Sequence, residues 1–242
     1  LEEDIVRVLV LPQGQLQMPR TWTVAPGLED LPPEGRDRMD TSGFALPAFD
    51  LAQDGTRLCI TTAQVRLTVA LQGFFCRWEG QHQGAWTATA ADRPTQSYNF
   101  GWWDDKVYHY LERARGEQYF GLGERAGDAN RAGQRYRMCN LDPMGYNARS
   151  TDPLYKHIPF YITRKGGEKD AGLCFGLFYD TLSDCSFDMG REMDNYHGHY
   201  RYFVAEHGDL DLYFIAGDGP AAITQRYTWL TGRPVFAPKY SL

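Results

Sequence analysis

A chain of 242 residues with 43% hydrophobic and 23% charged residues has the composition of an ordinary globular protein, which excludes a disordered chain. It contains no run of about 18 apolar residues, so the sequence predicts no transmembrane helix and no membrane partner. The net charge of −6 comes without a basic cluster and argues against a nucleic-acid partner. Aromatic residues make up 14% of the chain, which favours β-strands and also suits stacking on sugar rings.

The cysteines predict buried thiols rather than a disulfide framework. They are odd in number and form no C-x-x-C pair: Cys59, Cys76, Cys139, Cys174 and Cys185. The chain begins Leu1-Glu2-Glu3-Asp4, which has neither the charged nor the apolar region of a signal peptide. We therefore expect a reducing, cytoplasmic location, and we note that the absence of a starting Met is also consistent with a trimmed amino terminus.

The predicted elements, taken along the chain, are almost all strands. A β-branched run predicts a strand at 5–11, and six prolines in 12–55 predict loops around short edge strands. Further on, period-two alternation and turn residues predict strands at 57–60, 65–69, 106–113, 119–122, 134–139, 158–163, 173–179, 200–205 and 210–215. Many strands without intervening helices predict an all-β fold, a large antiparallel β-sandwich.

One helix is expected near the end of the chain. Asp218 or Gly219 precedes it and Pro220 occupies its first position. Its apolar stripe and its end are marked by Ile223, Tyr227, Leu230 and Gly232. We accordingly divide the chain into a sandwich domain at 1–218 and a linker helix with a lead-in segment at 219–242.

Four stretches from residue 119 onward carry a family resemblance. In chain order they read YFGLGERAGDANRAGQRYRMCNLDPMGY, TDPLYKHIPFYI, GLCFGLFYDTLSDCSFDMG and GDLDLYFIAGDGPAAITQRYTWLTGRPVFAPKYSL. They lie within residues 119–242, about half of the chain, and together they resemble glycoside hydrolase family 31, the α-glucosidase and α-xylosidase family. Residues 1–118 carry no diagnostic motif of that family.

The resemblance implies an N-terminal galactose-mutarotase-like β-sandwich followed by a (β/α)8 barrel. Family members are mostly retaining enzymes, which use two carboxyl groups about 5–5.5 Å apart, and both of these are Asp residues of the barrel. This chain shows no alternation of strands and helices, so we expect the barrel to lie beyond Leu242 and assign no catalytic residue and no cofactor here. The implied partners are an α-linked oligosaccharide and the missing barrel. Without that barrel, an exposed apolar face should lead to self-association as a homo-oligomer.

Three substrate-binding residues follow from the resemblance. Asp142, in the N-x-D motif, is expected to contact the sugar near the +1 subsite, because a carboxylate accepts paired hydrogen bonds from vicinal hydroxyls. Asn140 is expected to orient the same loop, and Tyr146 either stacks on a sugar or covers the sandwich edge. Read from the local sequence alone, Asp142 is better explained as the residue that forms an Asx turn, and only the resemblance favours sugar contact.

Other polar groups receive structural interpretations. Asp152 is expected to cap a turn, and Glu124 and Arg125 to form a structural ion pair. Asp104-Asp105, after Trp102-Trp103, is read as a solvated turn rather than a sugar site. His197-x-His199 could begin a metal site, but no third ligand at metal spacing is evident, so no metal is expected.

Three functions therefore compete. The first is the N-terminal domain of a glycoside hydrolase that shapes the substrate rim, and the second is a stand-alone carbohydrate-binding module. The third, a mutarotase, rests on fold analogy alone, which is weak evidence for function. It needs an acid–base pair of histidine with a carboxylate, and no spacing selects one among His109, His157, His197, His199 and His207.

Overall fold

The computed structural model describes residues 1–27, 31–101, 104–142, 144–145, 147, 155–166 and 172–233. Within these residues the chain forms seventeen strands and one helix, which confirms the predicted all-β class with a C-terminal helix. Every predicted strand coincides with an observed one to within two residues at either end. None of the described residues belongs to a helix long and apolar enough to cross a membrane.

The first sheet joins the two ends of the fold. Its strands, all antiparallel to their neighbours, are in spatial order β1 (Ile5–Val10), β17 (Leu210–Gly217), β14 (Cys174–Tyr179), β13 (Phe160–Arg164) and β11 (Gln118–Gly121). Val8 of the first strand pairs with Leu212 of the last, so the sheet closes only when the whole chain has been made.

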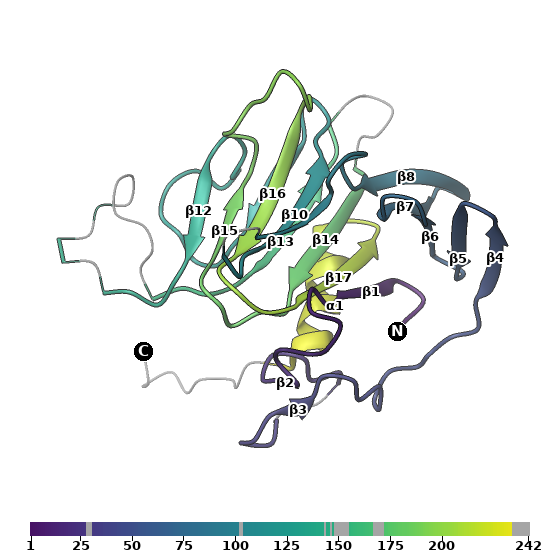
Figure 1. Cartoon of the computed structure of the whole chain (residues 1–242), viewed down its shortest axis with the longest axis horizontal. Coiled ribbons are helices and arrows are strands. Elements are labelled where there is room, and N and C mark those ends of the chain that lie inside the picture. Colours follow the sequence, from purple (N-terminus) through teal and green to yellow (C-terminus); the bar gives the residue numbers. More distant parts are fainter. Residues whose placement is uncertain are drawn as a thin grey trace.

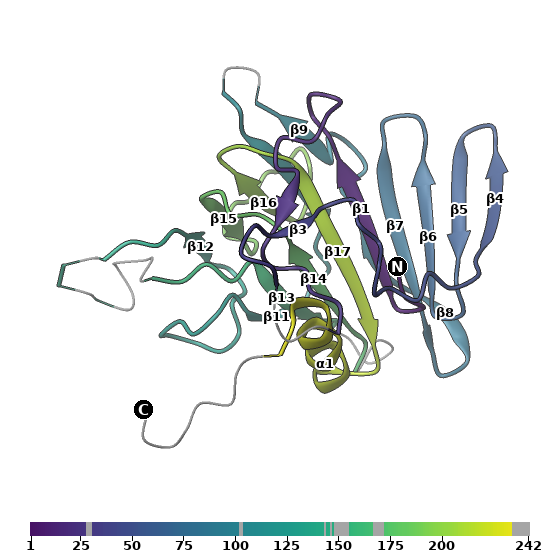
Figure 2. The same cartoon turned by 90° about the horizontal axis from the view of Figure 1, so that it is seen from below.

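Two further five-stranded sheets complete the architecture (Figures 1 and 2). The second contains β12 (Arg135–Met138), β15 (Cys185–Asp188), β16 (Tyr200–Ala205), β10 (Val107–Glu112) and β9 (Tyr98–Phe100). The third contains β4 (Asp50–Asp54), β5 (Arg57–Thr61), β6 (Val65–Ala70), β7 (Phe75–His82) and β8 (Ala85–Ala91). A bridge between Asp92 and Leu111 links the third sheet to the second.

The hairpin of β7 and β8 was missing from the sequence-based prediction. Of the glycines in this segment, Gly73 lies in a turn, with φ at 80°, whereas Gly80 lies inside β7. A Cβ atom at Gly80 would come within 3.3 Å of Thr89 on the neighbouring strand, so this glycine permits close packing rather than a turn. The proline-rich region holds the short ribbon of β2 (Arg20–Thr21) and β3 (Arg36–Asp37), as expected of edge strands.

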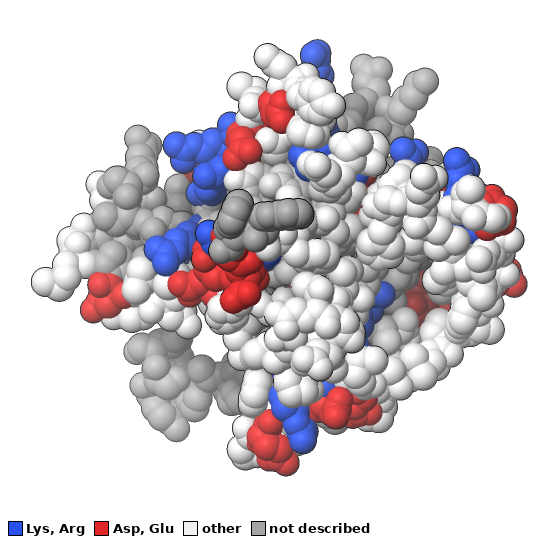
Figure 3. All heavy atoms as spheres, viewed as in Figure 1, with Lys and Arg blue, Asp and Glu red and all other residues white. Residues whose placement is uncertain are grey.

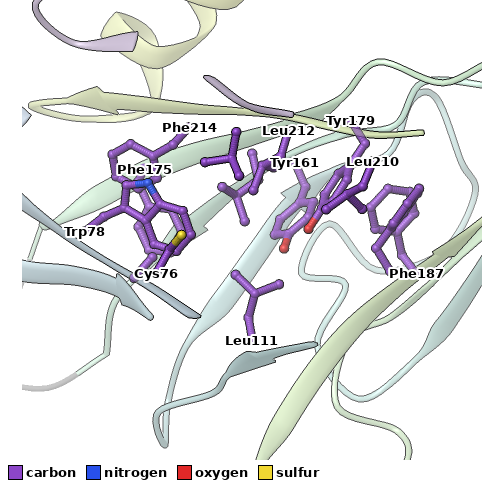
Figure 4. Close-up of a cluster of buried hydrophobic side chains, with 14 of the residues drawn as sticks. Cys76, Trp78, Leu111, Tyr161, Phe175, Tyr179, Phe187, Leu210, Leu212 and Phe214 are labelled. Carbon is purple, nitrogen blue, oxygen red and sulfur yellow. The ribbon is translucent and has the colours of Figure 1, made fainter. Parts of the chain in front are cut away.

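Aromatic rings from all three sheets form the main core (Figure 4). Trp78 of β7 stacks on Phe214 of β17 at 5.6 Å between ring centroids, and Phe214 lies at the same distance from Phe175 of β14. Tyr179 and Phe203 stack at 4.1 Å between the first and second sheets. Such pairs add to the stabilisation that burial of the rings already gives.

The cysteines follow the expected pattern, since all five are free, four are buried and Cys59 is half-buried.

The helix α1 (Pro220–Thr231) covers the other face of the first sheet. Ile223 and Leu230 are buried against that sheet, and the ring of Tyr227 stacks on Phe160 at 3.8 Å, which confirms the predicted apolar stripe. Gly219 is the N-cap, with no side-chain capping bond. The helix approaches β14 so closely that a Cβ atom at Gly176 would lie 2.6 Å from the side chain of Ile223.

A buried ion network fixes the proline-rich region to the first sheet. The Arg38 guanidinium lies 2.6 Å from the Asp211 carboxylate and 2.7 Å from that of Asp180. Arg7 pairs with the other oxygen of Asp211 at 2.7 Å. Burial alone would lower the pKa of Arg38, but the charges of Asp180 and Asp211 outweigh it and leave that pKa raised.

Replacement of Asp211 by Asn should strongly destabilise the chain, because Arg7 would lose its ion-paired carboxylate and Arg38 would keep only Asp180. Removing one member of a buried ion network costs about 3–5 kcal/mol. Urea unfolding, followed by intrinsic fluorescence, should show a clearly lower midpoint for D211N. The matched variant D50N changes an exposed aspartate of β4 and should leave the midpoint unchanged. Equal midpoints for the two variants would mean that the network does not stabilise the fold.

Replacement of Gly176 by Ala should push the helix away from the sheet. The new methyl group would meet Ile223 at 2.6 Å and Phe160 at 3.0 Å, and such overpacking costs about 1–3 kcal/mol. Gly55→Ala is the control, because that glycine has open space around it and no positive φ. We expect thermal unfolding of G176A several degrees below that of G55A, and coincident curves would contradict the close packing described for α1.

Candidate functional site

The candidate site is an arm that leaves the sandwich after β12. We define the arm as residues 139–142 and 155–158, two segments that run side by side. Cys139 forms an antiparallel bridge with Lys156, and the Tyr155 amide donates a hydrogen bond of 3.1 Å to the Leu141 carbonyl. Figure 1 shows the backbone after β12 extending away from the three sheets.

An acidic and a phenolic side chain meet on this arm. Asp142 is exposed, and its carboxylate accepts a hydrogen bond from the Tyr155 hydroxyl. That bond raises the pKa of Tyr155, because the neutral phenol is the better donor to a carboxylate. Tyr155 also has φ at 46°, in the left-handed region that bulky residues rarely adopt. Such a conformation persists only where surrounding contacts enforce it, and it is frequent at functional sites.

The structure brings together only part of the predicted site. Asn140 and Asp142 are both exposed on the same segment of the arm. Tyr146 lies outside the described residues. Tyr155, which sequence reasoning did not single out, is added to the site. Tyr155 and Asp142 are thirteen positions apart, and they meet because Cys139 bridges Lys156. No local sequence pattern predicts that bridge.

The base of the arm is tied to the neighbouring turn. The Glu124 carboxylate lies 3.6 Å from the Lys156 ammonium group at the surface, where an ion pair adds little stability. Arg125 instead donates from Nε to the Leu122 carbonyl at 3.0 Å and from Nη2 to the Arg137 carbonyl. Glu124 thus pairs with Lys156 and Arg125 bonds to main-chain carbonyls, whereas the expected ion-pair role of these residues at an interface with the barrel stays a prediction.

An exposed carboxylate beside a hydroxyl is suited to binding, because together they accept and donate hydrogen bonds to neighbouring hydroxyls of a ligand. Hydrogen bonds to an ionised carboxylate are roughly twice as strong as neutral ones. Apolar side chains near this pair in the sequence are exposed as well: Leu141, Met144 and Ile158, with Met144 at 93%. The arm therefore combines a polar ligand-binding pair with uncovered apolar surface.

The remaining polar candidates have local partners. His197 Nδ1 lies 2.5 Å from Asp194, and no group of three metal-binding side chains occurs in the described part of the chain. Asp104 accepts a hydrogen bond from the Lys106 amide and forms an ion pair with its ammonium group, as in a solvated turn. Asp152, Trp102 and Trp103 lie outside the described residues.

One histidine does pair with a carboxylate, as a mutarotase would need. His109 Nε2 lies 2.7 Å from Asp92, and Nδ1 lies 2.9 Å from the Tyr179 hydroxyl. The side chains of both His109 and Asp92 are 0% exposed, so no sugar reaches them in this structure. The pair links the second and third sheets within the core instead.

Comparison with known proteins agrees with this architecture. Residues 1–188 match the glycosyl hydrolase 31 N-terminal galactose mutarotase-like domain. α-Glucosidase 2 of Bacillus thermoamyloliquefaciens is 32% identical over 126 residues, which cover 52% of this chain and 15% of that protein. The α-xylosidase of Emericella nidulans is 32% identical over 132 residues, 54% of this chain and 15% of its own length.

A solved structure extends the similarity to the whole chain. The Flavobacterium johnsoniae GH31 dextranase, complexed with glucose, matches 100% of this chain with a TM-score of 0.77 and 26% identity. The match covers 26% of the dextranase chain, so the present chain spans a minor part of the relatives it resembles. Because the family match covers well over half of the 242 residues, the chain belongs to glycosyl hydrolase family 31, of which it carries the N-terminal galactose mutarotase-like domain.

Proposed function

We propose that this chain is one part of a larger hydrolase of α-glycosidic bonds, and that its arm forms a wall of the substrate site. The catalytic groups are assigned to a barrel that is not part of the 242 residues. The observation that carries the proposal is the exposed Asp142–Tyr155 pair, held in a strained backbone on an arm that stands clear of the sandwich.

The uncovered apolar side chains of the arm support a neighbouring domain. Leu141, Met144 and Ile158 are exposed near the polar pair in the sequence, and a surface of this kind is usually buried against a partner. A barrel docked there would bring the Asp142 carboxylate to the edge of its substrate pocket. In the isolated chain the same surface would favour self-association into a homo-oligomer.

The names of the relatives support an α-linked sugar as substrate. They include α-glucosidases and α-xylosidases, and a dextranase complexed with isomaltotriose is among the similar structures. A carboxylate and a phenol can hold vicinal hydroxyls of such a sugar. Five free thiols support a reducing, cytoplasmic location for the protein.

The variant Asp142→Asn, made in the full-length hydrolase, should raise KM for an α-linked disaccharide about tenfold while kcat changes little. The reason is the loss of a charge-assisted hydrogen bond made to the bound sugar, worth about 1.5–3 kcal/mol. Tyr155→Phe keeps the ring and removes the hydroxyl, so it should give a smaller change in the same direction. Asp128→Asn, at an exposed position outside the arm, is the control. An unchanged kcat/KM for D142N would show that Asp142 does not contact the substrate.

The purified 242-residue chain should release no nitrophenol from nitrophenyl α-glucoside, because we assign both carboxyl groups of the reaction to the barrel. The assay compares the chain with the full-length protein at equal molar concentration. Turnover by the chain that survives further purification would show that catalytic groups lie within residues 1–242.

A further inference from the structure

A concavity lies on the sandwich, apart from the arm. It has a volume of about 870 Å³, within the range of small-molecule pockets. One wall is the outward face of the third sheet, and the other is built from the segments that follow β10 and precede β16. We call it the arginine cleft, because its charged lining is Arg57, Arg77, Arg93, Arg113, Lys165, Arg201, Glu79, Glu112 and Glu117.

The period-two geometry of the third sheet turns several of these groups toward the cleft. Leu58 packs toward the core, so its neighbour Arg57 on β5 points outward. On β7, Cys76 and Trp78 are buried and Arg77 is exposed between them. The alternation that directs Leu58, Cys76 and Trp78 into the core therefore also directs Arg57 and Arg77 toward the cleft.

Two of the three carboxylates that line the cleft are already paired with a basic group. Glu117 lies 3.0 Å from Arg201 and 4.0 Å from Lys165. Glu79 pairs at 3.3 Å with Arg66, which does not line the cleft. Glu112 is exposed at the rim.

Four cleft arginines are left without a carboxylate at ion-pair distance among the described residues: Arg57, Arg77, Arg93 and Arg113. Figure 3 shows both basic and acidic groups on the face that it draws. The whole chain carries a net charge of −6, so the positive charge of the cleft is a local concentration.

Arg93 is held by an aromatic ring and by carbonyl groups rather than by a carboxylate. Its guanidinium lies 4.0 Å from the centre of the Tyr110 ring and donates to the carbonyls of Thr95 and Gln96. Burial lowers the pKa of Arg93, and nearby acidic groups, Asp194 and Glu192 among them, offset that effect only in part. For Arg201, burial also lowers the pKa, but Tyr161 and other acidic groups outweigh that effect and raise it.

Arg113 is a second arginine whose hydrogen-bonding groups are not all satisfied. Its Nε atom is buried and has no hydrogen-bond partner, while its guanidinium packs against the backbone of Gly190. Buried donors without an acceptor are uncommon and cost free energy. An anion that enters the cleft would therefore meet arginines whose charge is not yet neutralised.

The rest of the lining suits a sugar ring. Ala70, Phe75 and Pro94 offer apolar surface for the C–H face of a ring. His197 and His199 stand on the other wall, and imidazole nitrogens can accept or donate hydrogen bonds to hydroxyls. The cleft is also much larger than a free oxyanion needs.

We propose that the arginine cleft binds an anionic saccharide, a sugar that carries a phosphate or carboxylate group. The planar guanidinium fork matches both oxyanions through paired hydrogen bonds. The cleft is separate from the arm, so this proposal does not depend on the role proposed for Asp142.

Isothermal titration of the 242-residue chain tests the proposal with four probes: α-glucose 1-phosphate, glucuronate, glucose and inorganic phosphate. We expect at least one anionic sugar to bind at least about tenfold more tightly than glucose and than inorganic phosphate, and to weaken as salt is raised. The first two probes distinguish a phosphate from a carboxylate as the preferred group. If glucose binds as tightly as the anionic sugars, the anionic group does not contribute to recognition and the proposal is wrong. If inorganic phosphate binds as tightly as the anionic sugars, the sugar ring does not contribute and the proposal is likewise wrong. Absence of heat with all four probes would overturn it entirely.

The double variant R57Q/R77Q locates the binding in the cleft. Both side chains are exposed and unpaired, so folding should be preserved, and affinity for the anionic sugar should fall about tenfold or more. The matched variant R20Q/K106Q removes the same two charges outside the cleft and should retain full affinity. Equal loss in both variants would reveal a general charge effect and would refute the site, as would full binding by R57Q/R77Q. Thermal unfolding with and without ligand gives an independent readout, because a ligand that binds the native state raises Tm.

Discussion

The stack of Trp78, Phe214 and Phe175 is the contact that joins the first sheet to the third. Phe175 and Phe214 belong to the first sheet and Trp78 to the third, and the rings exclude water from the space between them. Once these residues face inward, the pleat of each strand turns their neighbours outward. The outward residues then make the surface on which any ligand must act.

The arginines of this molecule are found in two different electrostatic environments, one with paired carboxylates and one without. Where Arg7 and Arg38 are buried, Asp180 and Asp211 sit against them and hold the proline-rich region to the first sheet. In the arginine cleft the guanidinium groups outnumber the free carboxylates. A protein removes charge imbalance from its interior because desolvation is costly, so an imbalance kept beside a cavity points to a ligand of opposite charge.

The arm and the sandwich illustrate a division of tasks within one domain. The sandwich is closed by pairing between the first and last strands, which makes it a rigid support. The arm departs from its edge and carries the Asp142–Tyr155 pair on irregular backbone. Binding groups on a loop can vary from protein to protein without disturbing the core beneath them, and this is how one sandwich can serve enzymes that differ in substrate.

The sequence by itself determined the fold class, most strands, the helix and the family. Alternation at Val107, His109 and Leu111 indicated the buried face of β10, and Pro220 marked the start of α1, because both signals are local. The resemblance placed Asp142 and Asn140 on a loop, and the structure places both on one exposed arm.

Only the tertiary structure decided which distant groups meet. The contact of Asp142 with Tyr155, the pairing of His109 with Asp92 and the gathering of four arginines all join segments far apart in the chain. The hairpin of β7 and β8 was also hidden, because Gly80 serves close packing with a strand that the local sequence does not specify. Periodicity reports which face of a strand is buried, whereas the partner that covers it is set by long-range packing of the whole chain.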